Sequence, residues 1–222
     1  MVEMFQRHSE LLKDCMQKLF KSTIFVAGAG GLGCTVLSLI VRIGVKNIYL
    51  IDHGIVDEPD LNRQILYDRN DLGKSKVKVA GEKLKMINPE CNLITIDKTL
   101  DEKFILPAVD IVIDCLEGFR SKLILDDLCQ RKSIPLVHAG VGKFSGQVMT
   151  LMYNGGPTLK ELYRGAVEED KERQIFPPAV VLTAALQVSE MTKIICNKGD
   201  ILNGKILQIN LLQNHFDFLN LF

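Results

Sequence analysis

A glycine-rich stretch, FVAGAGGLG, runs from Phe25 to Gly33 and has the spacing of a phosphate-binding turn. Glycines permit a tight turn and a close approach of the backbone, and a helix that begins near Leu32 directs free N–H groups at an anion. An acid, Asp52, ends the next predicted strand about 20 residues later, where a ribose hydroxyl is commonly bound. The pattern predicts a nucleotide site. Tight packing of a strand against a helix through glycine is the alternative.

Two cations and an amide follow this acid at short spacing, namely Arg63, Gln64 and Lys76. Two cations near a phosphate site suit a triphosphate better than a dinucleotide, whose pyrophosphate already bridges two nucleosides. We therefore expect ATP rather than NAD as the ligand. An NAD-dependent oxidoreductase remains an alternative, because it shares the first strand–helix–strand unit.

The elements that must hold these residues alternate between the strand and helix periods of hydrophobicity. Strands are predicted over 23–26, 47–51, 92–96, 110–113 and 135–138. Helices are predicted over 9–20, 32–43, 76–87 and 121–131, with Ser9 as the N-cap of the first. This alternation predicts an α/β fold with a doubly wound, mostly parallel, Rossmann-like sheet that has helices on both faces.

The pattern changes from residue 140 onward. The segment SGQVMTLMY predicts a strand, the highly charged stretch 158–173 has no apolar stripe, and a helix is entered at Pro178 before one or two late strands. We expect a mixed C-terminal extension of the sheet, with an exposed, mobile crossover over about 154–176. The chain is thus predicted as a single domain with an N-terminal helix over 1–20, a nucleotide-binding half over 22–139 and a substrate-side half over 140–222.

The composition argues against two classes of partner. The chain has 222 residues, 47% of them apolar, and its 27 basic and 27 acidic residues cancel. Because the net charge is zero, the chain has no overall electrostatic field that would attract nucleic acid or a membrane surface. The N-terminus is charged throughout, and no segment has about 18 consecutive apolar residues. We expect a cytoplasmic protein that binds neither nucleic acid nor membrane.

The cysteines are scattered and include no C-x-x-C pair. This spacing predicts reduced, mostly buried thiols and neither a disulfide framework nor a zinc site. The six are Cys15, Cys34, Cys91, Cys115, Cys129 and Cys196.

Several sequence blocks occur together in an order that resembles the adenylating-enzyme family of ThiF, MoeB and the ubiquitin-activating enzymes. The blocks are GAGGLG, LID followed by DLNRQ, GKSKV with INP after it, DIVIDC, PLVHAGV with GQV, and the late LQVSEMTKII. They span about 7–219, so the resemblance is far more specific than a lone glycine motif.

The resemblance implies ATP and Mg²⁺ as cofactors, a homodimer, and a role for each matching residue. Gly28, Gly30, Gly31 and Gly33 would form the nucleotide loop and Asp52 would hold the ribose. Arg63 and Lys76 would contact the phosphates with support from Gln64, and Asp114 would hold Mg²⁺ on ATP. Arg7 would reach the ATP of the neighbouring subunit, although a solvent-facing arginine is the alternative.

The departures from the family pattern limit the reactions that the chain is expected to catalyse. Gly54 stands where many relatives have a second acid, and Asp60 replaces the usual Asn of N-L-x-R-Q. The two C-x-x-C pairs of the usual bacterial members are absent, so no structural zinc site is expected. No cysteine lies between Cys129 and Cys196, which excludes thioester formation at the crossover. Adenylation of a carboxylate remains, a reaction that requires no protein nucleophile.

The sequence is compatible with two classes of substrate. The short second half resembles the compact, zinc-free branch that includes HcgE-like proteins, and it offers little docking surface for a folded partner. This favours a small-molecule acid, such as the pyridinol carboxylate precursor of the iron-guanylylpyridinol cofactor. The alternative is the C-terminal glycine of a ubiquitin-like sulfur carrier protein of the thiamine or molybdopterin type. A catalytically silent nucleotide-binding scaffold is the remaining alternative.

Overall fold

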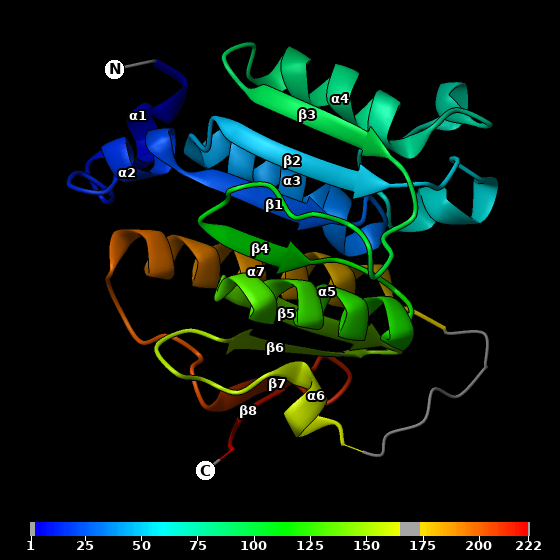
Figure 1. Ribbon diagram of the computed structural model, residues 1–222. Helices are drawn as coiled ribbons and strands as arrows, with labels where there is room; N and C mark the ends of the chain where they lie inside the picture. Colours follow the sequence, from blue (N-terminus) through cyan, green and yellow to red (C-terminus); the bar gives the residue numbers. More distant parts are fainter. Residues whose placement is uncertain (1–2, 165–173, 222) are drawn as a thin grey trace.

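The computed structural model describes residues 3–164 and 174–221, and its strands form a single mixed sheet (Figure 1). The strands are β1 (Thr23–Ala27), β2 (Asn47–Asp52), β3 (Asn92–Asp97), β4 (Ile111–Asp114), β5 (Leu136–Gly142), β6 (Ser145–Leu151), β7 (Lys205–Asn210) and β8 (His215–Asn220). Their order is β3-β2-β1-β4-β5-β6-β7-β8. β1 to β5 pair in parallel and β6 to β8 are antiparallel, which confirms the predicted fold and its mixed extension.

Helices cover both faces of the sheet, as predicted. They are α1 (Gln6–Ser9), α2 (Met16–Lys21), α3 (Gly31–Ile43), α4 (Lys76–Ile87), α5 (Phe119–Lys132), α6 (Leu159–Leu162) and α7 (Pro177–Cys196). The apolar sides of α3, α4 and α7 pack together on one face, and α5 and α6 pack on the other (Figure 1). The chain thus forms three layers with the sheet in the middle.

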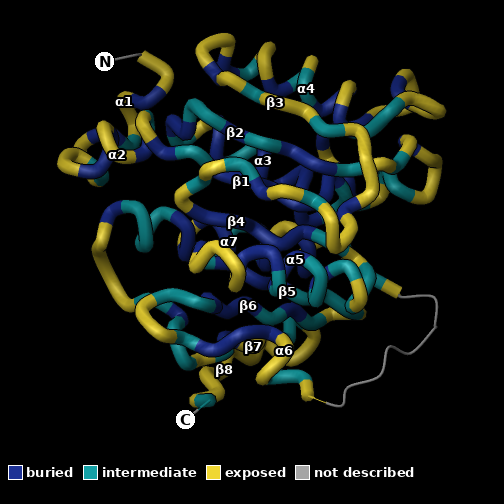
Figure 2. Tube along the Cα trace, in the orientation of Figure 1, coloured by how far each residue is buried: buried dark blue, intermediate teal, exposed yellow. Residues whose placement is uncertain are grey.

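The central strands are apolar on both sides because helices cover both faces. Along β1, Ile24 and Val26 pack on the α3 and α7 side, whereas Phe25 and Ala27 pack on the α5 side. This alternation is the period of two that a strand imposes on its side chains. Figure 2 shows the resulting buried centre, and the edge strand β8 is exposed along its length.

Two helices that flank the predicted nucleotide site have the expected bounds. α3 ends at Gly44, whose φ of 104° is left-handed and is readily adopted by glycine. α4 spans the predicted range and follows Ser75. Of the described helices, α7 is long and apolar enough to cross a membrane, but half of its most apolar window is buried inside the protein. It is a core helix that packs against α3 and the sheet.

The predicted helix over 9–20 is wrong over residues 10–15, which form turns, and is confirmed over residues 16–20. α1 ends at Ser9, whose hydroxyl donates to the Gln6 carbonyl, so Ser9 is not an N-cap, and α2 begins only at Met16. The intervening turn buries Cys15, which forms a disulfide with Cys196 at the end of α7, with Cα atoms 5.2 Å apart. The expectation that all cysteines are thiols is therefore wrong for this pair, because sequence spacing cannot reveal a contact across 181 residues.

The crossover is better anchored at its start than predicted. Thr158 caps α6, and the Asp126 carboxylate of α5 accepts hydrogen bonds from the backbone N–H groups of Leu159 and Lys160, at 2.8 and 3.2 Å. Leu159 is fully buried, so the expected exposure of this stretch is wrong at its beginning. The part of the predicted mobile segment over 165–173 lies outside the described residues.

Candidate active site

A cavity of about 390 Å³ opens at the carboxyl ends of the parallel strands. The strand order reverses between β1 and β4, because the chain proceeds from β1 to β2 and β3 on one side and then crosses to β4 and β5 on the other. Doubly wound sheets bind ligands in the crevice at this switch point. The cavity is lined by residues in or just beyond the carboxyl-terminal parts of four strands, among them Gly30, Asp52, Leu116 and Gly140.

The glycine loop joins β1 to α3 in a shape that larger residues would not allow. Gly28 has a φ of +103°, and a Cβ there would lie 2.6 Å from the Cys115 carbonyl oxygen; a Cβ on Gly33 would lie 2.0 Å from the carbonyl oxygen of Gly28. A Cβ on Gly30 would meet only the Gln64 amide at 3.9 Å, so this side of the loop is open to the cavity. The N-terminus of α3 has no capping side chain, which leaves its first N–H groups available to an anion.

Asp52 ends β2 at the edge of the cavity, as predicted. Its Oδ2 accepts a hydrogen bond from the Ala29 N–H at 2.7 Å, and its Oδ1 accepts one from the Gly54 N–H at 2.6 Å. These bonds fix the carboxylate beside the glycine loop. Each carboxylate oxygen has a second lone pair, so Asp52 can still accept a hydrogen bond from a ligand hydroxyl.

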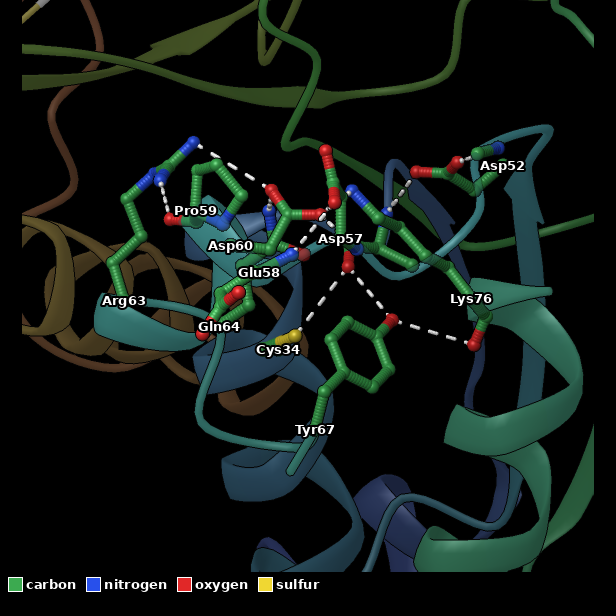
Figure 3. Close-up of polar contacts among 12 residues, drawn as sticks. Cys34, Asp52, Asp57, Glu58, Pro59, Asp60, Arg63, Gln64, Tyr67 and Lys76 are labelled. Atoms are coloured by element: carbon green, nitrogen blue, oxygen red, sulfur yellow. Dashed lines mark hydrogen bonds and ion pairs between the residues drawn. The ribbon is translucent and has the colours of Figure 1, made fainter. Parts of the chain in front are cut away.

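The predicted phosphate contacts meet around one carboxylate, that of Asp60 (Figure 3). The Lys76 Nζ lies 2.9 Å from Asp60 Oδ2, Gln64 Nε2 donates to Oδ1, and Arg63 Nη2 lies 3.8 Å from Oδ1. Asp60, Arg63 and Gln64 lie in or directly after a 3₁₀ helix over Glu58–Asn62, and Lys76 begins α4. The structure thus brings together the three side chains that the sequence assigned to one site.

Tyr67 and Cys34 support this site from below the glycine loop (Figure 3). The Tyr67 hydroxyl donates to the Ala29 carbonyl at 2.8 Å and lies 3.3 Å from the carbonyl of Lys76. Burial raises the pKa of the Cys34 thiol to about 12 and raises the pKa of Tyr67 as well. Both groups therefore remain protonated; the Tyr67 hydroxyl connects the loop to the start of α4, and the Cys34 thiol donates to the same Ala29 carbonyl at 3.4 Å.

Asp114, at the end of β4, is fully buried in a network of its own. Its Oδ2 lies 3.0 Å from Lys122 Nζ and 2.6 Å from His138 Nδ1, and its Oδ1 accepts from the Leu116 N–H at 3.0 Å. Burial alone would raise the pKa of Asp114, but Lys122 and His138 together hold it below its ordinary value. Burial lowers the pKa of His138, so the imidazole is neutral and donates from Nδ1.

A second, smaller cavity of about 130 Å³ adjoins the first. The two cavities share Lys122, whose ammonium also donates to the Ala139 carbonyl at 2.9 Å. Two further lining residues are hydrogen-bonded to each other, since the Gln147 amide donates to the Tyr163 hydroxyl at 2.6 Å. The remaining residues that line this cavity are Glu117, Phe119, His138 and Gly140.

Comparison with known proteins identifies the family. The model described as the ThiF family matches residues 5–222. The chain belongs to the ThiF family. This membership confirms the resemblance that the ordered sequence blocks predict, from the glycine loop to α7, while the HcgE-like branch stays a prediction.

Several relatives of this ThiF-family chain are between about one quarter and one third identical to it. A "Probable molybdopterin-synthase adenylyltransferase" from Gracilaria tenuistipitata var. liui is 34% identical over 96% of this chain, which spans 62% of the algal protein. The "Molybdopterin-synthase adenylyltransferase" of Haemophilus influenzae is 33% identical, with 89% of this chain and 84% of the relative covered. The "SAMP-activating enzyme E1" of Haloferax volcanii is 26% identical, with 97% and 84% covered.

Solved structures of two proteins share the fold. A crystal structure of E. coli MccB with ATP has a TM-score of 0.85 at 22% identity, covering 93% of this chain and 66% of MccB. A crystal structure of PaaA has a TM-score of 0.83 at 20% identity, covering all of this chain and 73% of PaaA. At these identities the likeness shows the ThiF-type fold.

The residues around Asp114 do not fit the Mg²⁺ role that the resemblance implies. Mg²⁺ takes carboxylate oxygens and waters in a near-ideal octahedron. Oδ2 of Asp114 already accepts from both Lys122 and His138 and Oδ1 accepts from Leu116, and the carboxylate is fully buried and does not line the cavity. In the described part of this ThiF-family chain, no group of three or more His, Cys, Asp or Glu residues could hold a metal ion. The predicted absence of zinc stays a prediction for metal analysis.

Arg7 is not brought to the cavity of its own chain. It lies exposed on α1, beside the amino ends of the parallel strands, whereas the cavity lies at their carboxyl ends (Figure 1). Its contact with a neighbouring subunit stays a prediction.

Sequence reasoning missed two buried polar residues, Lys122 and His138. Lys122 had a usable signal, because it stands three residues before the buried Leu125 and therefore on the inward face of α5. A lysine on the buried face of a helix requires an anionic partner. His138 lies within the apolar run of β5 and had no comparable signal.

Proposed function

We propose that this protein is an adenylyltransferase that transfers AMP from ATP to a carboxylate and releases pyrophosphate. The observation that carries the proposal is the cluster of Arg63, Gln64 and Lys76 in the same cavity as the open side of the glycine loop. Cations and helix N–H groups around one cavity at the switch point suit a triphosphate. ThiF-family membership and relatives named as adenylyltransferases support the proposal.

In the proposed reaction, an oxygen of the carboxylate attacks the α-phosphorus of ATP. The bond from that phosphorus to the oxygen bridging toward the β-phosphorus breaks, and pyrophosphate leaves with the electron pair. Arg63, Lys76 and the N-terminus of α3 stabilise the charge that develops on the phosphates. Asp52 accepts a hydrogen bond from the ribose. Mg²⁺ entering together with ATP would neutralise part of the phosphate charge.

No cysteine of the cavity is suited to attack the substrate. Cys115 lines the larger cavity, but burial raises the pKa of its thiol well above the ordinary value. A protonated thiol is a poor nucleophile. We therefore propose that the acyl group passes directly from AMP to an external acceptor.

Two substrate classes remain, each favoured by a different observation. The relatives named as molybdopterin-synthase adenylyltransferases favour the carboxyl terminus of a carrier protein. The small cavity beside Lys122 favours a small-molecule acid, because a cavity of about 150 Å³ holds one benzene ring and this one is of similar size. The pyridinol carboxylate is retained as one member of this second class.

Pyrophosphate exchange into ATP tests the proposal. Purified protein with ATP, Mg²⁺ and labelled pyrophosphate is offered one carboxylate at a time, from a panel of small aromatic acids and of proteins ending in Gly-Gly. Exchange that depends on one of these carboxylates supports adenylation and identifies the class. Tight NADH binding without ATP binding would contradict the proposal and favour an oxidoreductase, and ATP binding without exchange for any carboxylate would favour a silent scaffold.

A further inference from the structure

A carboxylate, that of Asp60, lies among the groups that the proposed function assigns to the phosphates. It contacts Lys76 Nζ at 2.9 Å, accepts from the Gln64 amide, and has Arg63 Nη2 at 3.8 Å. The side chains of Asp60 and Lys76 are only 14% and 13% exposed, so water screens their ion pair weakly. Without a nucleotide, these three groups share one anionic partner.

Asp60 is held in place independently of Lys76. Its Oδ2 accepts a hydrogen bond from the Asp57 N–H at 3.2 Å, because Asp60 is the third residue of the 3₁₀ helix that Asp57 caps. This capping box fixes the carboxylate to the backbone at the cavity wall. When Lys76 turns toward another anion, Asp60 stays where it is.

A triphosphate brings more negative charge into the same cavity. Phosphate oxygens and Asp60 then compete for the ammonium of Lys76, and the Asp60 carboxylate repels the phosphates. Asp52, another acid that lines the cavity, binds two backbone N–H groups, whereas Asp60 is the acid that pairs with Lys76 and Arg63. The competition therefore centres on Asp60.

We infer that Asp60 is a positioning residue that holds Lys76 and Gln64 in the cavity before nucleotide binds and then competes with the phosphates for Lys76. The inference rests on the proposed function, since it requires ATP in this cavity. Asp60 weakens the binding of ATP and of pyrophosphate alike. Weaker retention of pyrophosphate favours its departure after the bond to the α-phosphorus breaks.

Calorimetric titration of the full chain tests this inference, with the ATP analogue AMPCPP and Mg²⁺ and without any carboxylate. Asp60→Asn removes the charge and keeps an amide oxygen as acceptor. We expect the Kd for AMPCPP to fall about tenfold, as for the removal of one charged competitor, and to rise more steeply with salt. The KM for pyrophosphate in the exchange reaction should fall by a similar factor.

Asp57→Asn is the matched control, because it removes a charge from the same 3₁₀ helix while asparagine still caps it, and Asp57 does not line the cavity. Its Kd should stay within about twofold of the unmodified protein, as for an exposed charge. Asp60→Ala, which also removes the acceptor, should lower kcat more than Asp60→Asn does. If Asp60→Asn does not fold, Asp60→Ser removes the same charge and should tighten binding likewise.

Failure of the proposed function and failure of the role of Asp60 give different results in this titration. If the unmodified protein binds no AMPCPP, the proposed function fails. If it binds AMPCPP but Asp60→Asn binds it equally or more weakly, or if Asp57→Asn tightens binding as much, the role of Asp60 is overturned and the proposed function stands.

Discussion

At the scale of single residues, the contacts of Asp114 decide which groups face the substrate. The carboxylate is buried and does not line either cavity, whereas Lys122, which it holds at 3.0 Å, lines both. In the proposed reaction, an ammonium at this junction would lie between ATP in the larger cavity and a carboxylate in the smaller one. We therefore assign to Asp114 the positioning of Lys122 and to Lys122 the direct contact.

Asp114→Asn should lower carboxylate-dependent pyrophosphate exchange by about a hundredfold or more, because a preorganised electrostatic contact is lost. It also leaves Lys122 buried without its anion, which we expect to cost about 3–5 kcal/mol of unfolding free energy. Exchange rates and denaturant titration measure the two effects.

Asp110→Asn is the control for this substitution, since Asp110 is exposed just before β4 and accepts a hydrogen bond from the Thr23 N–H. It should leave exchange nearly unchanged. Full exchange activity in Asp114→Asn would contradict the assigned role of Asp114.

His138 gives the stability a pH dependence of known sign. Burial lowers its pKa in the folded protein below the ordinary value of 6.5, so below pH 6.5 the unfolded chain binds a proton that the folded chain does not. Stability should therefore fall as the pH falls from about 7 toward 5, by at most about 1.4 kcal/mol per pH unit for one proton. The lowered pKa of Asp114 acts only in a more acidic range, below its ordinary value of 3.8.

Urea unfolding at several pH values measures this slope. His138→Asn should flatten it between pH 7 and about 5, whereas His215→Asn, at an exposed histidine of β8, should keep it. An unchanged slope in His138→Asn would show that other groups cause the acid sensitivity.

At the scale of elements, the sequence predicted the strands and helices around the candidate nucleotide site but not how the second half of the chain is held. The glycine loop, α3, β2 and α4 follow from local rules, namely hydrophobic period, a glycine at the end of a helix, and an acid at the end of a strand. The break between α1 and α2 and the anchoring of α6 depend on contacts with α7 and α5, which are distant in sequence. Local patterns carry no information on such contacts.

Asp126 connects α5 to α6 and thereby fixes Tyr163, which follows α6 and lines the small cavity. Asp126→Ala should raise the KM for the carboxylate by about tenfold, because lost positioning weakens substrate binding. The Kd for ATP should stay unchanged, since Asp126 does not line the larger cavity. Asp127→Ala, one residue further on the exposed side of α5, is the control. If Asp126→Ala weakened ATP binding as strongly as it raised the KM for the carboxylate, the assignment of separate roles to the two cavities would be contradicted.

At the scale of the whole molecule, α1, which carries Arg7, lies beside the amino ends of the parallel strands (Figure 1), whereas the residues that line the cavity lie at their carboxyl ends. If Arg7 acts at all, it acts across a two-fold dimer, which the resemblance implies. In mixed dimers of Arg7→Ala and Asp114→Asn chains, one of the two sites then has neither change. We expect exchange activity to return to about half that of the unmodified dimer if the sites act independently. No recovery in a verified heterodimer would exclude the role of Arg7 in trans.

The central claim is that the cavity joins AMP to a carboxylate, and isotope transfer tests it most directly. The protein is incubated with ATP, Mg²⁺ and a carboxylate active in the exchange assay, labelled with ¹⁸O in both carboxyl oxygens, and the acyl product is then released with hydroxylamine. Attack by the carboxylate on the α-phosphorus predicts AMP that carries one ¹⁸O atom, measured by mass spectrometry. AMP without the label, formed at the same rate, would show that water attacks the phosphorus and would contradict adenylation.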